Sequence, residues 1–201
     1  MKLFLAAFIL CLGFTSAFAQ QDQQPIVDGG ISYPNWNFRS IENEDKVDLR
    51  KFAAGKKLVM VVYFAPWCHD WDYDVAIVQA LHDKYAKDGL GIIGVGEYDT
   101  LSKLKAHLNQ KSITFPTVYE STASSERLNT EHYKIRTAAG DKRKWGSPFY
   151  VFIESANVLP KGDTIAEKVN VVNGELFKDE ADKFIRTKLG LKPETAAADQ
   201  K

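Results

Sequence analysis

Cysteine is scarce in this chain, and the mature protein is predicted to keep only one. The sequence contains two cysteines, Cys11 and Cys68. Cys11 lies in a segment that we expect to be removed, which excludes an internal disulfide and a cysteine-rich metal site. Cys68 is therefore expected to be a reactive thiol, a partner in an intermolecular disulfide, or an inert buried side chain.

An excess of charge of one sign is also missing, since 26 basic residues balance 26 acidic ones. A balanced chain gives no reason to expect nucleic acid or an anionic membrane as a partner. The densest basic cluster, at residues 142–144, is expected to be a solvated loop. Apolar runs after residue 20 are short, so the mature chain is expected to make no stable membrane insertion.

The N-terminus has the pattern of a cleavable signal peptide. Lys2 supplies a positive charge, residues 3–14 form a short apolar run, and residues 17–19 read Ala-Phe-Ala, which fits a cleavage site. We predict a signal peptide over residues 1–19 and hence a periplasmic or secreted protein. Two alternatives stay open, a lipoprotein acylated at Cys11 and an uncleaved anchor.

The remaining residues fit one domain with short appendages. We predict a flexible arm over residues 20–30, an α/β domain over 31–191 and a disordered tail over 192–201. The arm is polar and rich in Gln and Asp, and the tail is solvated, so neither is expected to pack.

Strand and helix patterns alternate through the first half of this domain. Continuous β-branched and apolar runs at residues 58–64 and 90–96 predict strands buried on both faces. Apolar residues at helical spacing predict helices over 72–87 and 100–109. This succession predicts βαβ units around a parallel core.

The flanking segments predict further elements. These are an N-terminal hairpin at 36–49, a connection at 51–57, a short helix at 131–137 within an enlarged polar loop at 121–145, a strand at 149–153, a second hairpin at 165–177 and a closing helix at 179–189. The second hairpin is assigned from Asn173-Gly174, a dipeptide that type I′ turns prefer.

Cys68 follows a predicted strand and precedes a predicted helix. A cysteine at a helix N-terminus lies near unpaired backbone N–H groups and the positive end of the helix dipole, which favour the nucleophilic thiolate. Asp70, Asp72 and Asp74 oppose this effect, because nearby negative charge disfavours a second anion. His69 either offsets them when protonated or is simply a polar residue at the helix start.

The segment Tyr63-Phe64-Ala65-Pro66-Trp67-Cys68 resembles the active site of the thioredoxin superfamily, where a strand is followed by F-x-x-W-C and the first helix. It is most similar to the exported TlpA/ResA-type, redoxin-like thiol–disulfide oxidoreductases, from about Phe38 to Leu189. The resemblance implies a thioredoxin-like α/β fold, with a mixed central sheet flanked by helices and an N-terminal hairpin. It implies no cofactor and, as partner, a protein thiol or disulfide client or a low-molecular-weight thiol.

Three other segments carry the resemblance and imply site residues. Val95-Gly96-Glu97 is similar to a strand ending whose glutamate lies near the cysteines, which implies that Glu97 handles protons for Cys68. Ile113-Thr114-Phe115-Pro116 resembles the I-x-F-P segment of that branch. Ser147-Pro148 resembles the cis-proline element that positions an extended substrate. The substrate-binding residues implied in this way are Trp67, Trp71, Ser147 and Pro148.

Two departures from the family pattern limit what the resemblance implies. The C-x-x-C motif reads Cys68-His69-Asp70-Trp71, so a tryptophan stands in place of the resolving cysteine. Dithiol enzymes use the second thiol to release the mixed disulfide, a step that this chain lacks. Val62 stands where many thioredoxins bury an aspartate. We therefore predict monothiol chemistry with Cys68 as the nucleophile.

Other functions stay open beside thiol–disulfide exchange. A non-catalytic interaction module would keep the substrate groove and use Trp71 as an exposed anchor, whereas in a redox protein Trp71 could instead pack over the sulfur. A one-cysteine peroxidase is disfavoured, because Ala65 and Val61 stand where those enzymes carry a hydroxyl and a proline. A metal site is disfavoured because adjacent side chains at a helix start diverge. His107 is expected on a helix surface.

Overall fold

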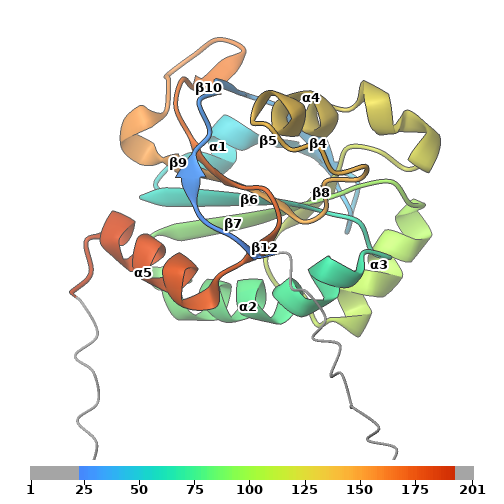
Figure 1. Cartoon of the computed structure of the whole chain (residues 1–201), viewed down its shortest axis with the longest axis horizontal. Helices are drawn as coiled ribbons and strands as arrows, with labels where there is room; N and C mark the ends of the chain where they lie inside the picture. The colour runs from blue at the N-terminus through green and yellow to red at the C-terminus, as the bar shows by residue number, and fades with distance from the viewer. Residues whose placement is uncertain (1–22, 193–201) are drawn as a thin grey trace, which may run out of the picture.

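The computed structural model describes residues 23–192, so the predicted signal peptide and nearly all of the predicted tail lie outside the described residues. An eight-stranded sheet runs through the middle of the molecule (Figure 1). In sheet order its strands are β2 (Val27–Asp28), β11 (Asn170–Val172), β9 (Phe149–Glu154), β6 (Leu58–Phe64), β7 (Leu90–Gly96), β8 (Thr117–Tyr119), β4 (Asn37–Ser40) and β5 (Lys46–Asp48).

The centre of the sheet is parallel and its margins are antiparallel. β6 pairs with β7 and β7 with β8 in parallel, whereas β9 runs antiparallel to β6. The predicted N-terminal hairpin is present as β4 and β5, and it extends the sheet beyond β8. Every residue of β6 and β7 is buried, as their continuous apolar sequence predicted. The prediction of a mixed central sheet is confirmed.

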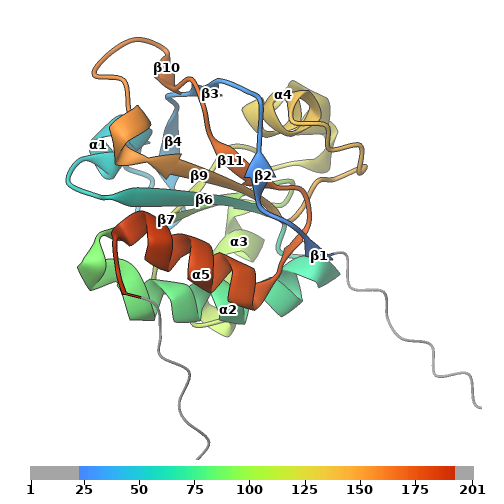
Figure 2. The same cartoon turned by 60° about the vertical axis from the view of Figure 1, so that its left-hand side comes forward.

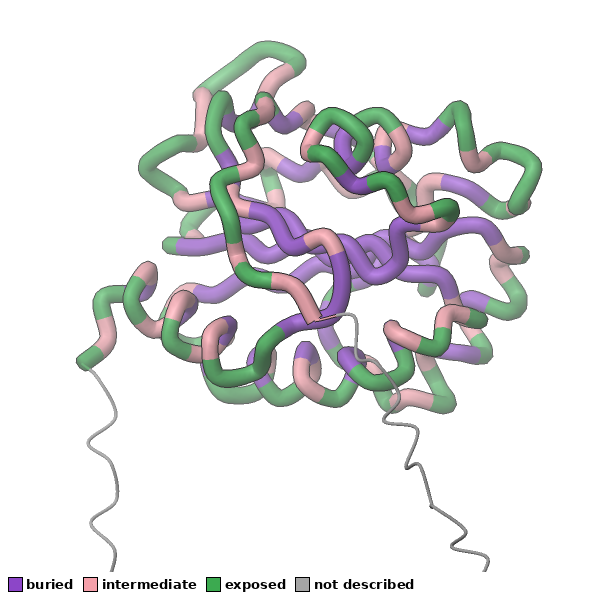
Figure 3. Tube along the Cα trace, in the orientation of Figure 1, coloured by how far each residue is buried: buried purple, intermediate pink, exposed green. Residues whose placement is uncertain are grey.

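Helices cover both faces of the sheet (Figures 1 and 2). One face, called the α2 face below, is covered by α2 (His69–Tyr85), α3 (Leu101–Gln110) and α5 (Lys178–Leu189). The opposite α4 face carries α1 (Leu49–Ala53) and α4 (Glu131–Ala138). Short 3-10 helices are η1 (Ala86–Asp88), η2 (Ser124–Asn129) and η3 (Ser155–Asn157). Buried residues concentrate in the strands between these layers (Figure 3). Among the helices of residues 23–192, none has the length and apolar character that a membrane span requires.

Helix α2 begins three residues before the predicted start, at His69. Cys68 is its N-cap residue, and the first turn is helical because Trp71 packs inward with Val75 and Val78. The spacing of these three residues continues the apolar stripe that the sequence showed from Val75 onward. The helix therefore starts immediately after the cysteine.

The predicted flexible arm is wrong for residues 23–30. β1 (Gln23–Gln24) pairs in parallel with β12 (Glu175–Leu176), and β2 pairs with β11. The backbone N–H of Ile26 donates to the Glu180 carboxylate at 3.1 Å. Partners distant in the sequence supply these hydrogen bonds, so a polar composition did not reveal them.

The predicted hairpin at 165–177 is also wrong. β11 has β9 on one edge and β2 on the other, so neither edge is left for β12. β10 (Thr164–Ala166) pairs instead with β3 (Tyr33–Pro34). Asn173-Gly174 turns the chain, but the strand after the turn, β12, pairs with β1 rather than with β11.

Two short helices complete the α4 face. α1 occupies part of the predicted connection, and the Asp48 carboxylate caps it by accepting from Lys51 N at 2.8 Å. The predicted helix at 131–137 is confirmed as α4, which Thr130 caps through Tyr133 N at 3.0 Å. With η2 it lies in the enlarged segment between β8 and β9, residues 120–148, which is called the insertion below.

Candidate active site

Cys68 lies between the end of β6 and the first turn of α2. Its half-buried Sγ donates to the Ser147 carbonyl oxygen at 3.1 Å. The Ser147 hydroxyl in turn accepts from Ala65 N at 2.9 Å. Two hydrogen bonds therefore join the cysteine loop, residues 65–68, to the segment before β9, although 79 residues separate Cys68 from Ser147.

The Ser147–Pro148 peptide bond is cis, as the resemblance implied. Both residues are buried, and Ser147 contacts the cysteine segment through its hydroxyl and carbonyl groups. That Ser147 and Pro148 bind substrate remains a prediction. Of the predicted substrate-binding residues, Trp67 is the exposed one, at 45%.

Arg143 is a site residue that the sequence analysis missed. Its guanidinium donates to the carbonyl oxygens of Pro148 at 2.8 Å and Ser147 at 3.4 Å, and an ion pair of 2.8 Å with Asp141 fixes its orientation. The basic cluster at 142–144 is therefore only partly the solvated loop that was predicted. Because Arg143 and the Cys68 thiol share one carbonyl, a fixed positive charge lies near the sulfur.

Trp71, three residues after Cys68, is a core residue. The side chain is fully buried, stacks on Phe64 with ring centroids 4.9 Å apart, and donates through its indole N–H to His107 Nε2 at 2.9 Å. The prediction that Trp71 binds substrate, and the alternative that it is an exposed anchor, are wrong. His107 is likewise buried rather than on the surface, and burial lowers its pKa.

Trp67 begins a surface of aromatic rings and cations beside Cys68. Its ring meets Trp145 of the insertion edge to face, at 5.1 Å between centroids. Arg127 and Lys144 lie 5.4 and 5.2 Å from the centroid of the Trp145 ring. Trp67 also lines a hollow of about 280 Å³ that extends to Lys103 of α3.

Glu97 follows β7 and turns its carboxyl group toward the insertion. The side chain is fully buried and accepts a hydrogen bond from the Ser121 hydroxyl. Burial, and then the negative charge of Glu120, raise the pKa of Glu97 well above its usual value. In the described chain its hydrogen bonds do not reach Cys68, so the predicted proton-handling role remains a prediction.

Glu120 connects Glu97 to the first turn of α4. Its carboxylate accepts from the backbone N–H groups of Glu131 and His132, the latter at 3.1 Å. The buried His132 ring then bonds the Tyr98 hydroxyl at 2.8 Å and the Gly146 carbonyl at 3.0 Å. Burial lowers the pKa of His132 well below its usual value, so the ring is neutral in this network.

Arg136 holds the end of the insertion in place. The guanidinium is buried and donates to the carbonyl oxygens of Arg143 at 2.7 Å and Lys144 at 3.2 Å. A Cβ atom on Gly146 would lie 2.3 Å from Arg136 Cδ, so glycine is required where the two segments cross. The position of Arg143 and Lys144 beside the cysteine therefore depends on a buried arginine.

Asp74 is a second site residue, which the sequence predicted only as a negative charge near Cys68. It is 1% exposed, and its Oδ2 accepts from the Tyr150 hydroxyl at 2.5 Å and from Leu176 N at 2.9 Å. Burial raises the pKa of Asp74 to about 7. Tyr150 also lies within electrostatic range of Cys68, which packs against the same apolar cluster. The helical stripe through Trp71 and Val75 includes position 74 and could have identified it.

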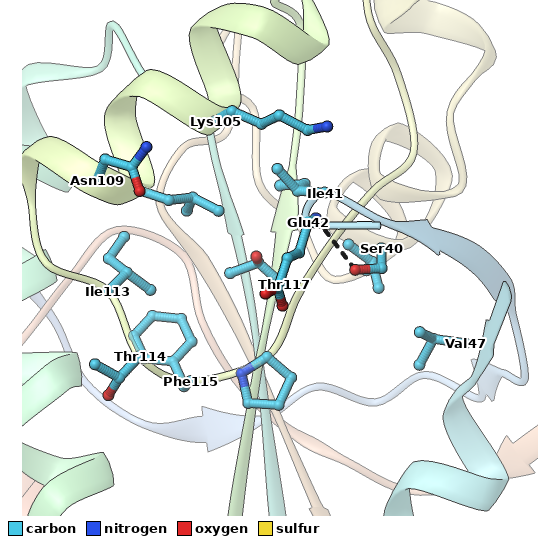
Figure 4. Close-up of a pocket in the computed structure, with 13 residues that line it drawn as sticks. Ser40, Ile41, Glu42, Val47, Lys105, Asn109, Ile113, Thr114, Phe115 and Thr117 are labelled. Atoms are coloured by element: carbon cyan, nitrogen blue, oxygen red, sulfur yellow. Dashed lines mark hydrogen bonds between the residues drawn. The ribbon is translucent and has the colours of Figure 1, made fainter. Parts of the chain in front are cut away.

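A larger hollow of about 550 Å³ lies elsewhere, between α3 and the β4–β8 edge (Figure 4). Lys105 and Asn109 of α3 form one rim, and Ile113 and Phe115 line its apolar side. The predicted site residues do not line it. No group of three or more His, Cys, Asp or Glu side chains in residues 23–192 is placed to hold a metal ion.

Comparison with known proteins identifies the fold. The sequence matches no protein-family model and no curated protein. A thiol:disulfide interchange protein of the thioredoxin family from Chlorobium tepidum has a similar structure, with a TM-score of 0.58 and 17% identity over 80% of this chain and 97% of its own.

Two further solved structures show the same arrangement. The C-terminal domain of a thiol-disulfide oxidoreductase from Bacteroides thetaiotaomicron gives a TM-score of 0.59 at 16% identity, covering 80% of this chain and 95% of that one. A secreted thiol-disulfide isomerase from Corynebacterium glutamicum gives 0.59 at 12% identity, covering 79% and 85%. The chain therefore has a thioredoxin-like fold, as the sequence predicted.

Proposed function

We propose that this chain is an exported monothiol protein of the thioredoxin fold, which exchanges thiols and disulfides through Cys68. The observation that carries the proposal is the 3.1 Å hydrogen bond from Cys68 Sγ to the Ser147 carbonyl, which sets the half-buried sulfur at the start of α2. The solved structures that share the fold are described as thiol–disulfide interchange proteins, oxidoreductases and isomerases. Export to a periplasm or beyond rests on the pattern of residues 1–19.

The proposed reaction has two balanced steps. The Cys68 thiolate attacks one sulfur of a disulfide R–S–S–R′, forming Cys68–S–S–R and releasing R′–S⁻. A second thiolate R″–S⁻ then attacks the sulfur of R, forming R–S–S–R″ and returning the Cys68 thiolate. Because Trp71 fills the resolving position, R″ comes from outside the chain, as a protein thiol or a low-molecular-weight thiol.

Deprotonation of the Cys68 thiol, which supplies the thiolate for the first step, is assigned to Asp74 with Tyr150. A carboxyl group whose pKa is about 7 exchanges a proton near neutral pH, and Tyr150 links it to the surroundings of Cys68. Glu97 remains the candidate from the sequence. It lies on the α4 face, whereas Asp74 lies on the α2 face with Cys68.

A non-catalytic interaction module is the second candidate function. One observation favours it, namely that Trp71 and His107 form a buried, hydrogen-bonded pair where a redox enzyme would carry its second thiol. In that case the fold would be retained for binding and Cys68 would be inert toward disulfides.

Reaction with oxidised glutathione separates the two candidates. We expect the reduced mature protein to gain one glutathionyl group, detected by intact-protein mass spectrometry and removed by dithiothreitol. The Cys68→Ser variant is the matched control and should gain none. A folded wild-type protein that forms no adduct, even with excess oxidised glutathione at pH 8, would contradict the exchange function and favour the binding module.

A further inference from the structure

Four side chains form a continuous surface next to Cys68, called the tryptophan–cation patch. Trp67, the residue before the cysteine, contacts Trp145 at 5.1 Å between ring centroids. The charged groups of Arg127 and Lys144 lie over the Trp145 ring, and Arg127 Nη1 also donates to the Lys144 carbonyl at 2.9 Å. The patch therefore joins Trp67, next to the cysteine, with two parts of the insertion, η2 and residues 144–145.

Both cations of this patch are available to a partner. Across residues 23–192 no carboxylate lies within ion-pair distance of Arg127 or Lys144, whereas Arg143 is paired with Asp141 and Lys103 with Asp99. Stacking on an indole ring holds a cation in place without neutralising its charge. Lys144 and Trp67 are exposed.

The acidic side chains that follow Cys68 do not cancel this charge. Asp72 forms an ion pair of 2.8 Å with Lys111, and Asp74 is buried. Asp70 lies in the first turn of α2, where the positive end of the helix dipole offsets its charge. The insertion side of the cysteine is therefore positive and aromatic.

We infer that the tryptophan–cation patch selects a protein client whose reacting cysteine is flanked by acidic residues. Carboxylates of the client would meet Arg127 and Lys144, and the neighbouring backbone and side chains would pack on the exposed Trp67 and the partly exposed Trp145. A client residue next to the reacting sulfur reaches this patch, because Trp67 is adjacent to Cys68 in the chain. The inference rests on the proposed function and names the substrate class of the same site.

The test uses peptides whose single cysteine is activated as a mixed disulfide with 5-thio-2-nitrobenzoate. The Cys68 thiolate attacks the peptide sulfur, a Cys68–peptide disulfide forms, and the coloured thionitrobenzoate anion leaves and is followed by its absorbance. Three peptides of equal length carry Asp, Asn or Lys on both sides of the cysteine. The thionitrobenzoate mixed disulfides of glutathione and of uncharged 2-mercaptoethanol serve as small probes.

We expect the Asp peptide to react about tenfold faster than the Lys peptide at low ionic strength, as is typical of electrostatic steering. This ratio should approach one in about 1 M salt, where charges are screened beyond about 3 Å. Lys144→Glu should reduce or reverse the ratio while leaving the rate with the 2-mercaptoethanol probe within about twofold. The exposed Lys161→Glu, in the loop before β10, is the matched control and should keep the wild-type ratio.

The outcomes separate the inference from the proposed function. If Cys68 reacts with no probe, the exchange function itself fails. If all three peptides react at one rate, or if Lys144→Glu keeps the wild-type ratio, the acidic-client inference is wrong and the exchange function stands. If the glutathione probe outpaces the Asp peptide, the patch serves a small anionic thiol, and the assignment to a protein client is overturned.

Discussion

The two faces of the central sheet bury polar groups in different ways. On the α2 face, apolar helix stripes cover the strands, and the polar groups are isolated pairs such as Trp71–His107 and Tyr150–Asp74. On the α4 face, a connected network runs through the core. The Tyr33 and Tyr63 hydroxyls bond at 2.6 Å, and the Tyr63 ring stacks on His132 at 4.5 Å.

This difference has consequences for the site. A helix stripe forms wherever apolar residues recur at the right spacing, so it tolerates changes away from the stripe. A buried polar network requires every partner, because each unpaired group costs its full desolvation free energy. The α2 face therefore fixes Cys68 by packing, whereas the α4 face fixes Arg143 and Lys144 by hydrogen bonds that extend from Glu97 to Gly146.

Trp71→Ala should give the largest effect, on the α2 face. The change removes a fully buried ring, leaves a cavity against Phe64 and leaves His107 Nε2 without its donor. We expect the free energy of unfolding in urea to fall by about 3–5 kcal/mol. Tyr73→Ala, two residues further along the same helix and 45% exposed, is the control and should cost far less. Equal losses would mean that Trp71 does not pack as described.

Asp74→Asn and Glu97→Gln compare one buried acid from each face. Burial raises the pKa of both carboxyl groups in the folded protein. Below the pKa of the unfolded chain both states are protonated, so the stability of the wild type is fully present there. As pH rises, the unfolded chain loses protons first and the wild type becomes less stable, until pH passes the folded pKa.

For Asp74 this loss falls between about pH 4 and pH 7 and amounts to at most about 4 kcal/mol. We expect Asp74→Asn to flatten the dependence of the unfolding free energy on pH over this range, since the amide can accept the same two hydrogen bonds. The rate of glutathione adduct formation, measured against pH on the same variants, identifies the proton-handling group. If Glu97→Gln shifts the pH dependence of this rate and Asp74→Asn does not, Glu97 is the proton-handling group.

Arg136→Met should give a smaller loss of stability, on the α4 face. Methionine keeps much of the buried volume but removes the two hydrogen bonds that hold the Arg143 and Lys144 carbonyls. We expect a loss of about 2–3 kcal/mol in urea unfolding. The exposed Arg39→Met, which loses one hydrogen bond to the Glu44 carbonyl, should cost less than about 0.5 kcal/mol.

The same variant tests the link between the network and the site. Without Arg136, the insertion should hold Lys144 less firmly, so the preference for the Asp peptide should fall while the 2-mercaptoethanol probe still reacts. An unchanged preference would show that the patch keeps its position without the buried arginine.

Helix and strand patterns were sufficient to predict the α2 face and the fold. The runs at 58–64 and 90–96 became β6 and β7 with the predicted bounds, because short, continuous apolar runs rich in β-branched residues favour strands buried on both faces. Cys68 was placed correctly at the start of α2, because the strand pattern ends before it and the helical spacing begins after it. The prediction for Trp71 was wrong because the helical stripe of Val75 and Val78 extends back to position 71 and buries that side chain.

The sequence by itself therefore determined the thioredoxin-like core, the position of Cys68 and the tryptophan, rather than a second cysteine, at position 71. Only the tertiary structure decided which groups surround the sulfur. Arg143 donates to the Ser147 carbonyl, and Asp74 accepts from Tyr150, 76 residues away in the sequence. Glu97 accepts from Ser121. Local propensity acts over a few residues, whereas buried polar groups take their partners from whatever segment the fold brings near, and that information lies outside any local pattern.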